Sequence, residues 1–249
     1  MASILFWNCR GARKKQASLY LKEMVKDYKV FFVGLLETKV SNFSKSEIEN
    51  LIGKDWNFFQ VPAIGLSGGI IVLWKYKLAS FTCLSSSNQV IIGDLEIMEK
   101  GRWRVATVYR GKDTIHRRLI WEKLKEFRSN NIPLLLRGDF NCVLAKEEKK
   151  GGRPFQFSQG PREMSSFLAR SGLHEVSFIG PKFTWCNNKD DNARILERLD
   201  RCNANSVALK NNQMVLRHLS RVASDHNPIL LNFLEENFVS DKIIRFEEV

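Results

Sequence analysis

Short apolar segments bounded by turn-forming residues recur along the first 233 residues of the chain. Segments of this length that are rich in β-branched and aromatic side chains are typical of strands. The pattern predicts strands at residues 4–8, 30–37, 56–61, 70–74, 78–85, 89–97, 102–109, 133–137, 182–185, 195–201, 216–220 and 229–233. We therefore expect a protein with extensive β-sheet.

Four other segments have the spacing of amphipathic helices. Ala17–Tyr28 and Ile120–Phe127 place apolar side chains on one helical face. Ser44 and Glu47 have the spacing of a capping box, and a proline and a glycine bracket a fourth helix at 161–172. Because helices separate some strand pairs and tight turns separate others, we expect mixed sheets in a layered α/β sandwich.

The chain shows no division into several large domains. No Pro/Ser-rich linker or internal repeat interrupts residues 1–233, so we expect one domain there, followed by an acidic C-terminal tail at 234–249. The longest apolar run, Val30–Leu36, is far shorter than the roughly 20 residues of a membrane-spanning helix. The N-terminus lacks a basic signal segment, and the five cysteines show no CxxC spacing. We expect an intracellular protein with reduced thiols and no membrane partner.

The positive charge is concentrated in the body of the chain. The formal net charge is +12, and because residues 234–249 hold five acids and two bases, a net of −3, residues 1–233 carry +15. Residues 99–128 alone contain ten bases and four acids. A strongly basic domain attracts polyanions, of which nucleic acid is the commonest inside cells. Charge alone also allows a solvated basic surface without a dedicated ligand.

Lone polar residues end or follow several of the apolar strands. They stand at four separate strands: Asn8, Glu37, Asp139, Asn141, Asp225 and His226. In α/β sandwiches such strand ends project into a shared crevice, where sites form preferentially. We therefore expect these side chains to share one rim of the molecule.

Each of these residues also has an ordinary structural explanation. A carboxylate at a strand end is more often a turn former or a helix cap, and Asp139 after a glycine is common turn chemistry. Asn8 can start a turn, and Asp225 with His226 can be a surface pair. It is the combination of several such residues that indicates a site.

The polar residues belong to six short motifs that follow one another in a characteristic order. The motifs are Trp7-Asn8, Glu37-Thr38-Lys39, Val108-Tyr109, Gly138-Asp139-Phe140-Asn141, Arg198-Leu199-Asp200 and Ser224-Asp225-His226-Asn227-Pro228. In this order, over residues 1–233, they resemble the endonuclease/exonuclease/phosphatase superfamily. The resemblance implies a four-layered α/β sandwich, with two mixed β-sheets packed face to face and helices outside.

Three further runs resemble a narrower group within that superfamily. They are Gly151-Gly152-Arg153-Pro154, Gly180-Pro181-Lys182-Phe183-Thr184-Trp185 and Leu196-Glu197-Arg198-Leu199-Asp200-Arg201. These runs look most like the apurinic/apyrimidinic-type endonuclease domain at the N-terminus of plant LINE (non-LTR) retrotransposon polyproteins.

The resemblance implies a metal site and a water-activating pair. Glu37 would be the principal ligand of Mg²⁺ or Mn²⁺, supported directly or through water by Asn8 and Asp225, and an oxygen-only ligand set suits a hard cation. Asp139 would orient or deprotonate the attacking water, and Asn141 would hold a phosphoryl oxygen. Because residues i and i+2 of an extended chain point the same way, both should face one phosphate.

The resemblance also implies roles for three residues around the phosphate. His226 would hydrogen-bond or protonate a phosphoryl oxygen, and Asp200 would orient its imidazole and stabilise the charge. Tyr109 would contact the scissile phosphate, and the alternative for Tyr109 is a core aromatic with a satisfied hydroxyl. Basic residues soon after Tyr109 are candidate nucleic-acid contacts, although a solvated surface explains them equally well: Arg110, Lys112, Arg117 and Arg118.

A few conspicuous residues have no role in these motifs. We expect His116, His174 and His218 to be surface or structural residues, and Trp185 to lie in the core with its ring near the site. Cys142 stands where the family usually has a polar residue, and an exposed thiol there would be prone to oxidation.

These features together predict a monomeric, nuclear, metal-dependent endonuclease. It would nick DNA and leave 5′-phosphate and 3′-hydroxyl ends, the latter able to prime reverse transcription at an insertion site. Two alternatives stay open: a phosphoesterase of the same fold acting on RNA, inositol phosphates or phospholipids, and a non-catalytic nucleic-acid-binding remnant. The acids of the motifs predict a small negative pit within a positive surface.

Overall fold

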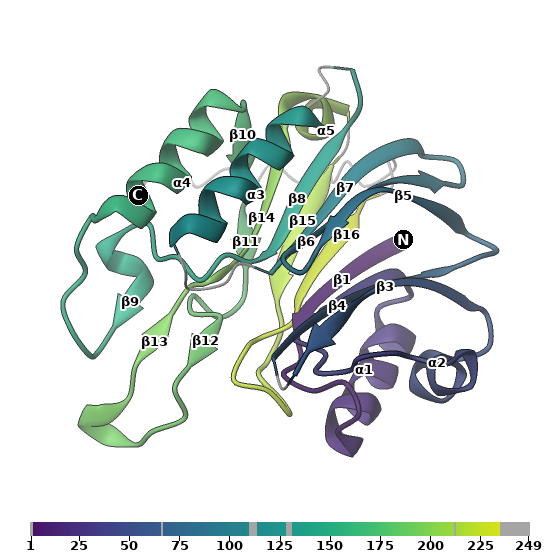
Figure 1. Ribbon diagram of the computed structural model, residues 1–249, viewed down its shortest axis with the longest axis horizontal. Coiled ribbons are helices and arrows are strands. Elements are labelled where there is room, and N and C mark those ends of the chain that lie inside the picture. Colours follow the sequence, from purple (N-terminus) through teal and green to yellow (C-terminus); the bar gives the residue numbers. More distant parts are fainter. Residues whose placement is uncertain (1, 66, 110–113, 128–130, 212, 235–249) are drawn as a thin grey trace, which may run out of the picture.

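Two large β-sheets lie face to face in the computed structural model, with helices on the outer face of each (Figure 1). The structure describes residues 2–65, 67–109, 114–127, 131–211 and 213–234. Within those residues, no helix has both the length and the hydropathy needed to cross a membrane. The layers run helices, sheet, sheet, helices, which confirms the predicted α/β sandwich.

The larger sheet carries the first and the last strand of the described chain side by side. Its seven strands among the described residues follow the order β11-β15-β16-β1-β2-β4-β3. Their bounds are β1 Ala2–Asn8, β2 Val30–Leu36, β3 Trp56–Ile64, β4 Ser67–Lys75, β11 Phe178–Ile179, β15 Met214–His218 and β16 Ile229–Phe233. Strand β1 runs parallel to β2 and antiparallel to β16.

The second sheet has six strands in the described residues, in the order β10-β14-β8-β7-β6-β5. Their bounds are β5 Ala79–Ser87, β6 Val90–Ile97, β7 Gly101–Tyr109, β8 Leu134–Asp139, β10 Leu173–Glu175 and β14 Asp200–Asn205. Strands β7 and β8 are parallel, whereas β8 and β14 are antiparallel. Both sheets are therefore mixed, as predicted.

A small third sheet lies beside the two large ones. It joins β12 Trp185–Cys186, β13 Leu196–Glu197 and β9 Lys149–Lys150, and the short helical turns η1 Lys146–Glu148 and η2 Asp191–Ala193 adjoin it. The hairpin between β12 and β13 projects from the body at the lower left of Figure 1.

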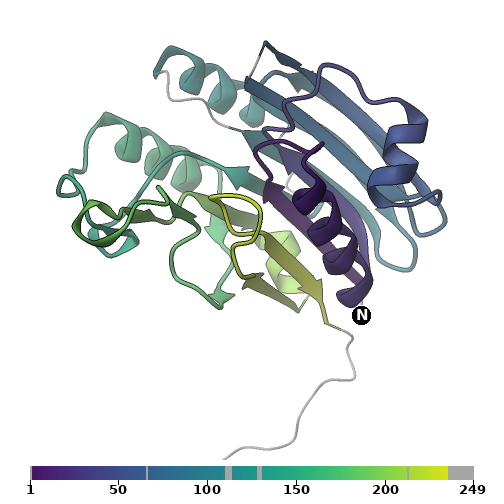
Figure 2. The same cartoon turned by 90° about the horizontal axis from the view of Figure 1, so that it is seen from below.

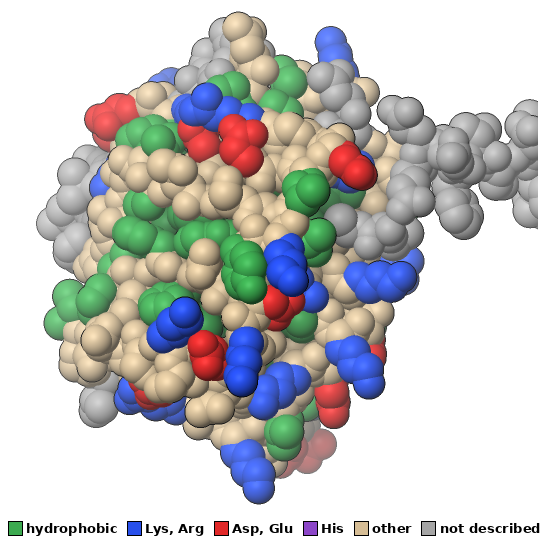
Figure 3. Space-filling view, turned by 90° about the vertical axis from the view of Figure 1, so that its right-hand side faces the viewer, with side chains coloured by type: hydrophobic (Ala, Val, Ile, Leu, Met, Phe, Trp, Pro, Cys, Tyr) green, Lys and Arg blue, Asp and Glu red, His purple; other side chains and the backbone are tan. Residues whose placement is uncertain are grey.

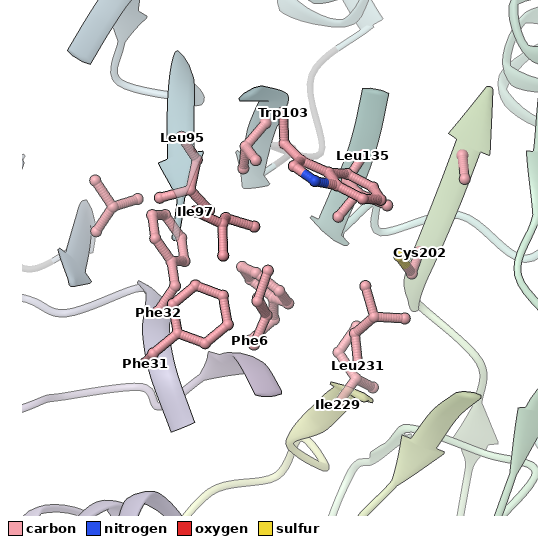
Figure 4. Close-up of a cluster of buried hydrophobic side chains, with 14 of the residues drawn as sticks. Phe6, Phe31, Phe32, Leu95, Ile97, Trp103, Leu135, Cys202, Ile229 and Leu231 are labelled. Atoms are coloured by element: carbon pink, nitrogen blue, oxygen red, sulfur yellow. The ribbon is translucent and has the colours of Figure 1, made fainter. Parts of the chain in front are cut away.

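The central strands are buried on both faces. In β1, Ile4 and Phe6 belong to the core between the sheets, whereas Leu5 and Trp7 belong to the cluster beneath the helices. Figure 4 shows the inter-sheet core, where side chains from both sheets meet. Because both faces are buried, these strands have continuous apolar sequences rather than alternating ones.

The four predicted helices are present. They are α1 Lys15–Asp27 and α2 Lys45–Ile52 on the larger sheet, and α3 Thr114–Glu126 and α4 Gln159–Arg170 on the other. A further short helix that was not predicted, α5 Ser206–Asn211, lies between β14 and β15. Helix α2 begins with the predicted capping box, since Ser44 Oγ accepts from the backbone N–H of Glu47, whose carboxylate accepts from the N–H of Ser44.

Several strand boundaries differ from the prediction near the small sheet. The strand predicted at 182–185 is β12, which begins only at Trp185, and the strand predicted at 195–201 is divided into β13 and β14. The division falls at Arg198 and Leu199, whose backbone N–H groups bond the Glu148 carbonyl and the Thr184 hydroxyl instead of a strand ladder. The segment predicted at 216–220 is β15, which is shifted to Met214–His218. Strands β10 and β11 and helix α5 are too short to show a hydrophobic period.

One charged side chain lies in the inter-sheet core. Arg137 of β8 is fully buried, and its guanidinium carbon lies 3.4 Å from the ring centroid of Phe6. No nitrogen of its guanidinium has a hydrogen-bond partner among the described residues. Burial lowers the pKa of Arg137 well below its ordinary value.

Candidate active site

The polar residues of the six motifs meet at one end of the two sheets, by the loop before β16 that is drawn in yellow near the centre of Figure 2. Tyr109 ends β7, Asp139 ends β8 and Asp200 begins β14; in the strand register, Asp139 is opposite both Tyr109 and Asp200. The larger sheet contributes Asn8 at the end of β1 and Glu37 directly after β2, and Asp225 and His226 lie in the loop before β16. The structure thus brings together residues that are up to 218 positions apart in sequence.

The centre of this site is a buried hydrogen-bonded cluster. His226 Nδ1 lies 2.9 Å from Asp200 Oδ2, and His226 Nε2 lies 3.7 Å from Asp139 Oδ2. The side-chain amide of Asn8 donates to Asp139 Oδ2 at 3.0 Å and lies 3.4 Å from His226 Nε2. Each of these four residues is at most 4 % exposed. Buried polar groups that are bonded in this way hold one another in a fixed geometry.

Charges within the cluster shift two pKa values. Burial by itself lowers the pKa of His226, but the carboxylates of Asp200 and Asp139 outweigh burial and raise it above its ordinary value. Burial raises the pKa of Asp139, and the positive charge of His226 only partly offsets this. His226 is therefore held as an imidazolium at neutral pH, while Asp139 is a carboxylate closer to its protonation point than usual. These are the properties of a hydrogen-bond donor and a proton acceptor.

Backbone contacts fix the two aspartates of the cluster. Gly138, directly before Asp139, has φ +135°, and a Cβ atom there would lie 1.9 Å from the carbonyl oxygen of Val108. Only glycine fits this close approach of β8 to β7. On β14, the hydroxyl oxygen of Thr184 accepts from the backbone N–H groups of Leu199 and Asp200, each at 3.0 Å.

Asn141 lies beside Asp139, but not for the reason given by the sequence. The expectation of an extended chain is wrong, because β8 ends at Asp139 and Asn141 has φ +45°. The chain turns instead: the backbone N–H of Asn141 donates to Asp139 Oδ1 at 2.9 Å, and its amide donates to Asp139 Oδ2 at 3.3 Å. This is an aspartate-initiated turn, a conformation that asparagine tolerates.

The outer part of the site contains a residue that the sequence did not single out. The guanidinium of Arg10 lies between Glu37 and Asp225: its Nε is 3.3 Å from Glu37 Oε2, and its Nη1 bonds Asp225 Oδ2. Lys39 Nζ lies 3.4 Å from Glu37 Oε1. Arg10 follows Asn8 by two residues, but its charge alone did not distinguish it from the other basic residues of the chain.

Two further residues support the outer part. The indole N–H of Trp185 donates to Asp225 Oδ2 at 3.0 Å, so Trp185 is a half-buried residue of the site rather than only a core aromatic. The hydroxyl of Ser224 donates to the carbonyl of Asn8 at 2.7 Å and accepts from the backbone N–H of His226. Burial raises the pKa of Asp225, but His226, Arg10 and Trp185 together lower it below its ordinary value.

Tyr109 lies between the inner and outer parts of the site. It is half-buried against the inter-sheet core. Burial, followed by the negative charges of Glu37 and Asp139, raises its pKa above the ordinary value, so its hydroxyl stays protonated at neutral pH.

The backbone is strained where the outer side chains project. Arg10, Glu37, Lys39 and Asn141 all have φ between +45° and +57°. Non-glycine residues seldom adopt this left-handed conformation, which costs about 1–3 kcal/mol and persists only where the surrounding structure enforces it. These four positions belong to the site, whereas other non-glycine residues with positive φ, such as Lys29 and Glu99, lie in turns elsewhere in the chain.

Two sets of side chains are candidates for holding a cation. The ligand atoms of Asp139, Asp200 and His226 lie within 4.8 Å of one another. His226 already bonds Asp200, however, and its raised pKa favours the protonated ring, which cannot ligate a metal. Glu37 and Asp225 instead share one positive group and offer only oxygen ligands, as Mg²⁺ and Mn²⁺ prefer. The donor set thus fits a hard cation at Glu37 and Asp225.

Not every predicted contact residue is described. Arg110 and Lys112 lie outside the described residues, and the side chains of His116, Arg117 and Arg118 in α3 are likewise not described. His218 is buried, with Nδ1 2.8 Å from the Pro181 carbonyl oxygen, which confirms a structural residue, whereas His174 is exposed. Cys142 is buried, so the exposed thiol considered for that position is absent.

Basic side chains are not confined to the site. On the flank of the molecule drawn in Figure 3, lysine and arginine side chains are scattered among uncharged and acidic ones. Next to the site itself lies a hollow of about 530 Å³ whose lining includes Arg10, Lys14, Lys39 and Asp225. The predicted contrast is therefore present locally, with a buried acidic cluster beside a basic hollow.

Comparisons with known proteins agree with this fold. The family model described as "Endonuclease/Exonuclease/phosphatase family" matches residues 5–226. The solved endonuclease domain of TRAS1, a telomere-specific non-LTR retrotransposon, superposes with a TM-score of 0.72 at 18 % identity and covers 95 % of this chain and 100 % of that one. The search of curated proteins found no match.

Two other solved structures share the fold. An AP endonuclease from Leishmania major has a TM-score of 0.72 at 17 % identity, with coverage of 92 % of this chain and 86 % of that one. The 3′ phosphatase NExo from Neisseria, bound to a product DNA hairpin, has a TM-score of 0.68 at 17 % identity, with coverage of 94 % and 99 %. At these identities the similarity establishes the fold.

Proposed function

The chain belongs to the endonuclease/exonuclease/phosphatase family, and we propose that it is a divalent-cation-dependent endonuclease that nicks DNA. The nick would leave a 5′-phosphate and a 3′-hydroxyl. In the setting of a LINE element, that 3′-hydroxyl would prime reverse transcription at the insertion site in the nucleus. The similarity in fold to the TRAS1 endonuclease domain supports this choice within the family.

One observation carries the proposal: the buried Asp200–His226 pair lies next to the buried Asp139, and the Glu37–Asp225 pair flanks them. Phosphodiester hydrolysis needs a positioned water, a proton acceptor for it and positive charge at the phosphoryl oxygens. The cluster offers these groups within one site. A protein that only bound nucleic acid would not need to bury three ionisable groups together, since that arrangement costs stability.

The roles of the inner residues follow from their protonation. Asp139 orients the attacking water and accepts its proton as the water oxygen bonds to phosphorus and the bond from phosphorus to O3′ breaks. The imidazolium of His226, held by Asp200, donates a hydrogen bond to a phosphoryl oxygen, and Asn141 donates from its amide to another. The departing O3′ takes up a proton from a solvent water molecule, which yields the 3′-hydroxyl end, and Asp139 returns its proton to solvent.

The outer residues hold the cation. Glu37 and Asp225 would bind Mg²⁺ or Mn²⁺ through carboxylate oxygens, with Asn8 and Trp185 fixing the neighbouring groups. The bound cation supplies a Lewis acid that neutralises charge on the phosphoryl and leaving oxygens. Tyr109, at the end of β7 and protonated at neutral pH, would donate a hydrogen bond to the scissile phosphate.

A plasmid-nicking assay tests the proposal. Supercoiled plasmid incubated with the protein and Mg²⁺ should become nicked circles, and EDTA should stop the conversion. Glu37→Ala and His226→Ala should each abolish it, whereas Glu23→Ala, at an exposed position of α1, should not. If the wild type and Glu37→Ala convert plasmid equally slowly, the proposal is wrong.

The products and alternative substrates complete the test. A DNA polymerase should extend the nicks directly, because each carries a 3′-hydroxyl, and a ligase should seal them. Release of phosphate from a 3′-phosphorylated oligonucleotide or an inositol phosphate, without nicking, would instead indicate a phosphomonoesterase, an activity that the NExo similarity makes worth measuring. Metal-independent DNA binding without turnover would indicate a non-catalytic remnant.

A further inference from the structure

Arg10 occupies an unusual place for a cationic side chain. It follows β1 in a turn with φ +45°, and its guanidinium bonds Glu37 and Asp225, which are the two carboxylates proposed to hold the cation. The Arg10 side chain is 43 % exposed, whereas the two carboxylate side chains are about 10 % exposed. A monovalent group of the protein thus lies where a divalent cation is expected to bind.

We propose that Arg10 is an exchangeable counter-ion that couples cation binding to DNA binding. Without a cation, Arg10 pairs with Glu37 and Asp225; when these carboxylates take up the cation, Arg10 turns away from them within the adjacent basic hollow and binds a phosphate of the DNA. The proposal deepens the proposed function, because it rests on the same cation site.

Charge explains why the two cations exclude each other. A guanidinium left in place would face the incoming divalent cation at close range, and like charges a few ångströms apart in a partly buried site repel strongly. Among the described residues, Lys39 is the one other cation that pairs with Glu37. The two negative charges of Glu37 and Asp225 cannot balance Arg10, Lys39 and a divalent cation at the same time. Binding of the cation therefore releases Arg10.

The hollow next to Asp225 can hold the released Arg10 side chain together with a phosphate. The hollow next to Asp225 is lined by Arg10 itself and by Lys14, Lys39 and Ser224, and it opens to solvent. A guanidinium donates two parallel hydrogen bonds to a phosphate, and a phosphate there replaces the carboxylates that Arg10 has lost. Cation and phosphate then each favour the state of Arg10 that the other needs, which is positive coupling between two ligands.

The variant Arg10→Met tests the exchange, because methionine keeps part of the apolar stem but carries no charge. Manganese binding to the protein alone, followed by the electron paramagnetic resonance signal of free Mn²⁺, should be at least about threefold tighter than in the wild type, since no ion pair has to be broken first. Lys14→Met is the matched control: it removes one positive charge from the same hollow, and no ion pair joins Lys14 to Glu37 or Asp225 among the described contacts. Its manganese affinity should stay within about twofold of the wild type.

The coupling itself is measured with DNA. Anisotropy of a fluorescent short duplex, recorded in EDTA and in Mn²⁺ with the duplex checked for integrity afterwards, gives the factor by which the cation strengthens DNA binding. This factor should be at least about threefold smaller in Arg10→Met than in the wild type, whereas Lys14→Met should weaken binding similarly in both buffers. The coupling factor of Arg10→Lys should lie between those of the wild type and Arg10→Met. Thermal melting confirms that each variant is folded.

Several results would overturn the exchange. They are an equal or weaker manganese affinity in Arg10→Met, an unchanged coupling factor, or the absence of manganese binding in both wild type and variant. None of them depends on turnover, so plasmid nicking by the wild type still decides the proposed function separately. Conversely, if Arg10→Met binds manganese more tightly but the wild type nicks no DNA, the exchange of Arg10 would be supported and the proposed nuclease function would be wrong.

Discussion

The inner and outer parts of the site are held in different ways. Asp139, Asp200 and His226 are almost completely buried; His226 hydrogen-bonds Asp200 and forms an ion pair with Asp139, and the two aspartates stand on neighbouring strands. Arg10 and Glu37 project from strained turns, and Arg10 is partly exposed. The inner part is therefore preorganised for chemistry, whereas the outer part can exchange its partners. The comparison can be tested by changing one part at a time.

Asp139→Asn should have the largest effect. Asparagine keeps the size of the side chain and one of the two acceptor oxygens that Asn8 and Asn141 use, but it cannot accept a proton from water. We expect the rate of plasmid nicking to fall about 10³-fold or more. A loss smaller than about tenfold would contradict the role of Asp139 as the base.

Asp200→Asn should change both the rate and its pH dependence. The proposed mechanism needs Asp139 deprotonated and His226 protonated, so the wild-type rate should rise above the ordinary pKa of aspartate and fall only above the ordinary pKa of histidine. Removing the charge of Asp200 lowers the pKa of His226, so the alkaline limb should move to lower pH and the rate should fall about 10²-fold. The pH–rate profile measures this, and Asp55→Asn, in an ion pair far from the site, should leave the profile unchanged. An unshifted alkaline limb would show that Asp200 does not set the charge of His226.

Thr184→Val should weaken the fold around the inner part. The backbone N–H groups of Leu199 and Asp200 would lose their common acceptor and stay buried, which should cost about 2 kcal/mol of unfolding free energy. Urea denaturation measures the loss, and Thr184→Ser, which keeps the hydroxyl, is the matched control. Equal stabilities of the valine and serine variants would show that the hydroxyl does not anchor β14.

Trp185→Phe should have the smallest effect and should act on the outer part. It removes the hydrogen bond to Asp225, and we expect manganese affinity to fall about threefold to fivefold, with the nicking rate restored at saturating Mg²⁺. Trp74→Phe, at a half-buried position of β4, serves as the control. A rate loss that high Mg²⁺ does not restore would place Trp185 in the chemistry itself.

Much of the fold and of the inner part followed from the sequence. Polar residues at or next to the ends of continuous apolar strands, namely Asn8, Asp139 and His226, predicted which side chains meet. A polar side chain at the end of a buried strand needs a polar partner, and the neighbouring strand ends provide one. The capping box before α2 was equally readable, since it depends only on residues three apart.

The parts of the fold and of the site that the sequence did not predict depend on contacts between distant segments of the chain. Nothing local distinguishes Arg10 from the other arginines; its partners Glu37 and Asp225 are 27 and 215 residues away. The same holds for Thr184, which anchors a strand 15 residues on. The turn at Asn141 was missed because periodicity does not show where β8 ends. Strands of two residues, such as β12 and β13, exist only because neighbouring segments pair with them.

The central pairing of β1 with β16 has a consequence for synthesis of the protein. The register joins Ala2 to Phe233, and the site takes Asn8 from one end of this chain segment and His226 from the other. While the chain is being made on a ribosome, β1 cannot pair with β16 until nearly all of the domain has been synthesised. A nascent chain therefore holds only fragments of the site, and no hydrolysis can begin until residues near 233 have left the ribosome.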